Sequence, residues 1–132
     1  MKQLCRYFLF WLLPLTLFAN HIYWQGNYNK ALQQAHHEHK PLLVLVVKKE
    51  DISTHTILKS ALMNQPYIDK INETMIAVMV TYEGRSSYPI EMYYTTVFPA
   101  LFFVDTQTET CMHEPLYGKE ITQKYLRHYF SF

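Results

Sequence analysis

The sequence predicts an α/β protein with a three-layer α/β/α arrangement around a central mixed sheet. The first observation is three short apolar runs, at residues 42–47, 75–81 and 100–104. Turn-forming or polar residues bound each run, as expected of strands buried on both faces. Helical patterns separate the first two runs and predict a parallel pair, whereas a short turn after the third predicts a hairpin. Helices on both faces of this sheet complete the three layers.

The first predicted helix begins at Tyr28, after a turn that ends in Asn27, a suitable N-cap residue. Its apolar face repeats at helical spacing and consists of Tyr28, Ala31, Leu32 and Ala35. The helix should end before Lys40-Pro41, because the residue that precedes a proline disfavours the α conformation.

Leu42–Val47 should form the central strand. The residues just beyond it, Lys48–His55, lie where α/β sheets usually carry their chemistry. Thr54–Met63 then has the apolar spacing of a helix, and Pro66 begins a further helix that extends to about Asn72.

The second half of the chain continues the pattern after the strand Met75–Thr81. Tyr82–Tyr94 is expected to be a loop with a short turn of helix. After the strand Ala100–Val104, Thr108–Leu116 alternates like an antiparallel edge strand. Gly118 introduces a last helix, Lys119–Phe130. Without repeats or linkers, residues 20–132 should form one domain.

The first nineteen residues predict a secretory signal peptide. Lys2 and Arg6 precede an almost wholly apolar stretch that ends at Ala19, and this stretch is short for a membrane span. Cleavage near Ala19 would place the domain in the periplasm or outside the cell. An uncleaved membrane anchor is the alternative, because Leu17 is large for its place before the cleavage site. The net charge of +1 gives no reason to expect a nucleic-acid partner.

The cysteine count excludes an internal disulfide in the mature domain. Cys5 lies in the signal segment, so Cys111 remains alone after cleavage. Cys111 is expected either to be buried as an apolar residue, the preferred interpretation, or to be a free thiol that can pair with another chain.

Four motifs in the predicted order carry a family resemblance. They are Trp24 with the first helix and Lys40-Pro41, the break Asn64-Gln65-Pro66, the run Val97–Asp105 around Phe98-Pro99, and Gly118. Together they resemble the thioredoxin-like domains of secreted bacterial proteins, over about residues 22 to 130. The resemblance implies a thioredoxin-like fold in which Pro99 is a cis-proline.

The resemblance also implies the location of a Cys-x-x-Cys motif, between the first strand and its helix. Counting forward from the Lys-Pro step places its cysteine positions near Asp51 and Thr54, and counting back from Pro66 places them near Ile52 and His55. Neither window contains a cysteine. Thiol–disulfide exchange requires an attacking thiolate and a second thiol. The degenerate window Asp51–His55 therefore predicts that dithiol oxidoreductase activity is absent.

Two other groups of side chains are candidate sites. Ser53 and His55 have a spacing at which a nucleophile and a base can meet, although Ser and Thr at such positions more often cap a helix, which is the preferred interpretation. His36 and His39 lie three residues apart on the first predicted helix, where two imidazoles can bind zinc or copper. No third ligand is assignable, so we expect neither a metal nor another cofactor.

Aromatic residues gather before Pro99, namely Tyr82, Tyr88, Tyr93, Tyr94 and Phe98. The resemblance implies that the cis-proline loop forms a groove for an extended peptide, lined here by Tyr94, Val97, Phe98 and Pro99. The other possibility is that the tyrosines only cover the core. We expect a non-catalytic protein-binding or chaperone-like module whose partner is another envelope or secreted protein. The alternatives are a redox partner that acts through Cys111 with an external thiol and, more weakly, a His-based metal-binding protein.

Overall fold

The computed structural model describes residues 21–84 and 87–130, so the predicted signal segment lies outside the described residues. The elements are α2 (Tyr28–Glu38), β1 (Leu42–Lys48), α3 (Ile52–Ala61), α4 (Gln65–Thr74), β2 (Ile76–Tyr82), β3 (Ala100–Asp105), β4 (Thr110–Cys111), β5 (Leu116–Tyr117), the 3-10 turn η2 (Gly118–Glu120) and α5 (Gln123–Phe130). None of the helices in this part of the chain has the length and apolar character that a membrane crossing requires.

The sheet is mixed, as predicted, and β1 lies inside it. The strand order is β2-β1-β3-β4, with β5 also paired to β3. β1 runs parallel to β2, with Leu42 beside Ile76, and antiparallel to β3, with Val46 beside Ala100. All six residues from Leu42 to Val47 are buried, because helices or a loop cover both faces of this strand.

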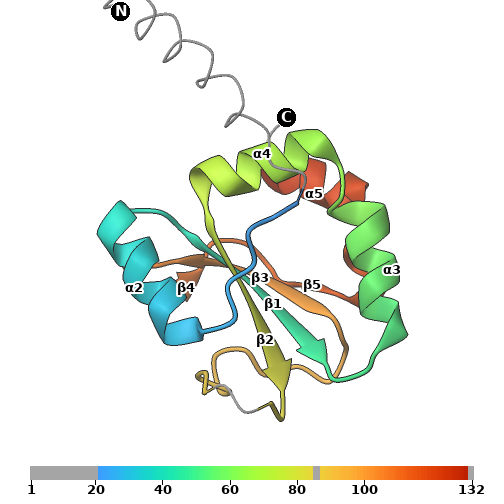
Figure 1. Cartoon of the computed structure of the whole chain (residues 1–132), viewed down its shortest axis with the longest axis horizontal. Coiled ribbons are helices and arrows are strands. Elements are labelled where there is room, and N and C mark those ends of the chain that lie inside the picture. Colours follow the sequence, from blue (N-terminus) through green and yellow to red (C-terminus); the bar gives the residue numbers. More distant parts are fainter. Residues whose placement is uncertain (1–20, 85–86, 131–132) are drawn as a thin grey trace, which may run out of the picture.

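The two faces of the sheet have different coverings (Figure 1). On one face, α3, α4 and α5 pack against alternate residues of β1, such as Leu43 and Leu45. On the other face, α2 and the loop around Tyr93 pack against the intervening residues, such as Val44 and Val46. This alternation gives the predicted three layers, since successive strand side chains point to opposite faces.

Four local predictions were wrong. The edge strand expected over Thr108–Leu116 consists of two short strands separated by residues 112–115, because Pro115 cannot donate to a ladder. The last helix begins at Gln123, after η2 and not at Lys119. The helix expected from Thr54 begins at Ile52, and its N-cap is Asp51 and not a serine or threonine. Residues 90–93 form a turn without helix.

Candidate functional site

The degenerate window forms the first turn of α3, directly after β1. Asp51 is the N-cap, and its Oδ1 accepts hydrogen bonds from the Ser53 hydroxyl at 2.6 Å and from the Ser53 backbone N–H at 3.0 Å. These two bonds hold the pKa of Asp51 below its ordinary value, with the hydroxyl contributing most. The carboxylate is therefore ionised at neutral pH, where it also complements the positive end of the helix dipole.

The two windows that the sequence left open differ in how exposed their residues are. Ile52 is 80% exposed and His55 is also exposed, whereas Thr54 is only 7% exposed. The pair Asp51 and Thr54 thus has one member at the helix cap and the other inside the fold. No sulfur atom is present at either pair of positions.

The geometry gives no support for a Ser53–His55 catalytic pair. The Ser53 hydroxyl donates to the Asp51 carboxylate, so its proton is directed to the cap. A nucleophilic serine requires its hydroxyl to donate to the base. Ser53 therefore belongs to the capping interaction that the sequence favoured, although as the partner of the cap and not as the cap itself.

The loop before β3 reaches the same edge of the sheet. The Phe98–Pro99 peptide bond is cis, as expected from the resemblance. Because Val46 pairs with Ala100, continuing this register places the buried Pro99 beside Val47, just before α3. The loop is held on its other side by the Gly118 N–H, which donates to the Pro99 carbonyl at 2.8 Å. Gly118 has φ +53, and a Cβ there would lie 3.0 Å from Val97.

The aromatic residues before Pro99 divide into two groups. Tyr93 is fully buried, and its hydroxyl lies 2.7 Å from that of Tyr28 on α2. Burial and this hydrogen bond raise the pKa of Tyr93. The ring of Phe98 lies against that of Tyr82, at a centroid distance of 5.3 Å, and both are half-buried. Tyr94, in contrast, is 65% exposed. Tyr93 therefore covers the core, whereas Tyr94 is exposed and the groove expected around it stays a prediction.

Of the four expected groove residues, Tyr94 and Val97 line a shallow hollow, whereas Phe98 is half-buried and Pro99 is buried. A hollow of about 250 Å³ is lined by Tyr94–Val97 and Tyr117, and Val97 is 49% exposed. Thr95 fixes the loop here, since its Oγ1 donates to the Val97 carbonyl at 2.7 Å and accepts from the Val97 N–H at 3.1 Å. The backbone that presents Tyr94 and Val97 is therefore braced.

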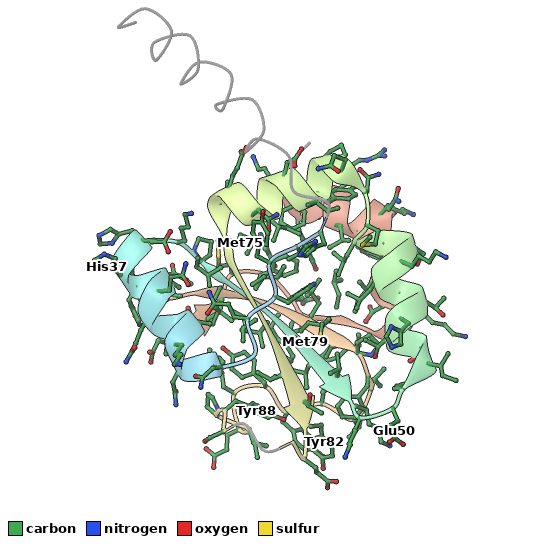
Figure 2. All side chains as sticks on the ribbon, viewed as in Figure 1. His37, Glu50, Met75, Met79, Tyr82 and Tyr88 are labelled. Carbon is green, nitrogen blue, oxygen red and sulfur yellow. The ribbon has the colours of Figure 1, made fainter. Side chains whose placement is uncertain are left out.

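Sequence reasoning missed two larger depressions on the β2 side of α3. The first, about 520 Å³, lies between the end of β1, the first turn of α3 and Met79 of β2. The second, about 680 Å³, lies beside Trp24 and Gly26 and shares Lys49, Met79 and Thr81 with the first. Figure 2 labels Met79 on β2 and Glu50 in the turn after β1. The apolar spacing over Thr54–Met63 predicted only a helix there.

Solved structures of three proteins are among those similar to this chain. A structure titled DsbH oxidoreductase matches with a TM-score of 0.67 and 16% identity, and the match covers 88% of this chain and 87% of that one. A thioredoxin from Thermus thermophilus matches with a TM-score of 0.67 and 12% identity, covering 86% of each chain. A proposed disulphide-isomerase from Bacteroides thetaiotaomicron matches with 0.63 and 19%, covering 83% of this chain and 93% of that one. This chain has a thioredoxin-like fold.

No protein-family model matches the sequence, and no curated protein matches it significantly. The structural similarity establishes the thioredoxin-like fold. Because the sequence identities are below one fifth, the activity has to be argued from the site. In this fold, the Asp51–Thr54 turn lies between β1 and α3, where the resemblance implied a Cys-x-x-Cys motif, and the Phe98–Pro99 bond has the implied cis form.

Cys111 lies away from this site in the thioredoxin-like fold. It pairs with Val104, near the end of β3 opposite to Ala100 and Pro99. The preferred expectation of burial was wrong: Cys111 is an exposed free thiol, because β4 lies at the sheet edge. Partial desolvation nevertheless raises its pKa, which leaves little of the nucleophilic thiolate at neutral pH.

The two candidate histidines do not share a helical face. α2 ends at Glu38, and His39 caps it in the left-handed conformation with φ 55, so the expected helical spacing to His36 is lost. The His36 Nε2 lies 3.8 Å from a carboxylate oxygen of Glu109. Among residues 21–84 and 87–130, no group of three histidine, cysteine or acidic side chains is placed to hold a metal ion.

Proposed function

We propose that this thioredoxin-like domain binds another protein without thiol chemistry, through the surface around Pro99. The observation that carries the proposal is the absence of sulfur from the turn where the resemblance implies Cys-x-x-Cys, together with exposed apolar side chains on that turn and on the cis-proline loop. Ile52 stands on the first turn of α3, and Val97 and Tyr94 stand on the cis-proline loop.

The chemistry of this surface suits the recognition of a protein segment. Exposed aromatic and aliphatic side chains on a braced backbone lose little conformational freedom when a partner covers them. The 250 Å³ hollow beside Tyr94 is small for an enclosed small-molecule site but suits a single side chain of a partner.

The partner is expected to be an envelope or secreted protein, because the first nineteen residues have the pattern of a signal peptide. Cleavage near Ala19 would leave a periplasmic or secreted domain. Amino-terminal sequencing of the mature protein would show a start near Asn20, and an intact Met1 would instead support the membrane-anchor alternative.

Replacing Tyr94 by alanine is expected to weaken partner binding at least about fivefold, because tyrosine is enriched among the interface residues whose truncation costs more than about 1 kcal/mol. Phe98→Ala should weaken it as well, although part of this effect would come from lost packing against Tyr82. A crosslinking pull-down followed by titration of the recovered partner measures both effects.

Tyr125→Ala is the matched control, since Tyr125 is an exposed aromatic residue on α5, remote in sequence from the cis-proline loop. Thermal unfolding of each variant separates loss of the fold from loss of binding. The proposal fails if every partner binds Tyr94→Ala and Phe98→Ala as tightly as the wild type.

A further inference from the structure

Positive charge is concentrated on three neighbouring elements, α3, η2 and α5. Residues 20–132 hold ten lysine or arginine residues and eleven acidic residues. The three elements hold four of these basic residues, Lys59, Lys119, Lys124 and Arg127, but only one of the acidic residues, Glu120. The rest of the domain therefore carries an excess of negative charge. Such segregation favours association of the basic part with a partner of opposite sign.

These four basic side chains are exposed to solvent. The two ion pairs among residues 21–84 and 87–130 involve other side chains. Glu120 is their acidic neighbour in sequence, but its Oε1 accepts a hydrogen bond from the Tyr117 N–H at 3.2 Å, which holds its carboxylate against its own turn. The positive charges are therefore available to a group outside the chain.

The elements that carry these charges lie against one another. α3 contacts both η2 and α5 (Figure 1). The side-chain amide of Gln123, at the start of α5, donates to the Ser60 carbonyl at 3.1 Å. This bond brings the beginning of α5, with Lys124, to the last turn of α3, with Lys59. The charges thus belong to one continuous part of the surface.

This part of the surface borders the surface around Pro99. Ile52 and Lys59 are both exposed and are seven residues apart on α3, so they lie on nearly the same helical face, about 10 Å apart along the axis. Lys119 directly follows Gly118, whose N–H donates to the Pro99 carbonyl at 2.8 Å. An extended peptide covers the distance from Ile52 to Lys59 with about three residues.

We propose that the partner segment bound at the Pro99 surface carries acidic residues, about three positions from its apolar contact with Ile52, that face Lys59 and Lys119. This inference rests on the proposed function, because the Pro99 surface supplies the apolar contact. α3 itself has no acidic residue, whereas Asp51 caps its start. Asp51 would repel a carboxylate beside Ile52, which favours acidic residues at the Lys59 end.

Two capped peptides test this inference, acetyl-Leu-Ala-Leu-Ala-Glu-Glu-Glu-amide and its analogue with three glutamines in place of the glutamates. The same pair in reversed sequence covers the opposite chain direction. Amide NMR titration of the full chain measures each affinity. At low salt the glutamate peptide should bind about three- to tenfold more tightly, because exposed ion pairs contribute modestly. The advantage should largely disappear at about 1 M salt, where the Debye length is about 3 Å.

The double variant Lys59→Gln/Lys119→Gln should bind the glutamate peptide only as tightly as the glutamine peptide, with the affinity for the latter unchanged. Lys30→Gln is the matched control and should behave as the wild type. Lys30 is an exposed lysine on α2, which covers the opposite face of the sheet from α3. Equal affinity of the wild type for the two peptides, or no binding of either at millimolar concentration, would overturn the inference.

Tyr94→Ala separates this inference from the proposed function. If the wild type binds both peptides equally and Tyr94→Ala weakens both, the Pro99 surface binds a partner without preference for acidic residues, and only the inference fails. If the glutamate peptide requires Lys59 and Lys119 but not Tyr94, the preference for acidic residues stands and the proposed function fails.

Vesicles of phosphatidylglycerol test the other anionic partner, a membrane surface. The inference predicts that the wild type and the Lys59→Gln/Lys119→Gln variant bind these vesicles equally. Vesicle binding that the double variant loses, together with equal binding of the two peptides by the wild type, would overturn the inference in favour of a membrane.

Discussion

Replacing Asp51 and Thr54 together by cysteine is expected to give the chain the thiol–disulfide exchange activity that its sequence lacks. The thiol introduced at position 51 would lie at the N-cap of α3, where the helix dipole stabilises a thiolate. The thiol at position 54 would lie three residues later, within reach on the same side of the helix. Such a pair can attack a disulfide and then resolve the mixed species.

Insulin reduction by a thiol-regenerated sample measures this gain, with the wild type expected to remain at background. The matched control is Ile52→Cys with His55→Cys, the other window that the sequence allowed. We expect less activity from it, because both positions are exposed and neither is the helix cap. Insulin reduction by the wild type, or an inert Asp51→Cys/Thr54→Cys variant whose cysteines form their disulfide, would contradict this assignment of the window.

Truncation of Phe103 to alanine is expected to lower the free energy of unfolding by about 3–5 kcal/mol. Phe103 is buried on β3, and its ring contacts those of Tyr129 at 5.1 Å and Phe130 at 5.7 Å, measured between centroids. The substitution would leave a cavity between the sheet and α5, which the rigid strand cannot fill. Urea denaturation measures the loss.

Tyr125→Ala again serves as the control for Phe103. Tyr125 lies on α5 and is 45% exposed, so the free energy of unfolding of the Tyr125→Ala variant should change by less than about 0.5 kcal/mol. If the Phe103→Ala substitution lowered the free energy of unfolding by less than about 1 kcal/mol, the packing of α5 on β3 described above would be wrong.

The elements that the sequence predicted correctly are those whose residues are buried on both faces. Leu42–Val47 is apolar throughout because both faces of β1 are covered, and no other element accommodates such a short run as well. The cis-proline followed from a resemblance carried by Phe98-Pro99 and its neighbours, and the structure has it. The three layers then followed from the order of the elements.

The failures concern ends of elements and sites assembled across the chain. His39 leaves the helix because Lys40-Pro41 follows, so a pattern of spacing there did not imply a shared face. Cys111 is exposed because β4 is only two residues long at a sheet edge, which its apolar character did not reveal. The depression beside Thr54 is lined partly by Met79, which is distant in sequence and belongs to no motif that the sequence shows.

We propose above that the domain holds its partner without thiol chemistry. A crosslinking pull-down of the full chain and of its Cys111→Ser variant, with and without a reductant, tests this claim directly. We expect the same partner in equal amount in all four samples, because Cys111 lies beside the end of β3 away from Pro99. Loss of the partner in the Cys111→Ser variant, or its release by the reductant, would contradict the claim and favour a redox partner acting through Cys111.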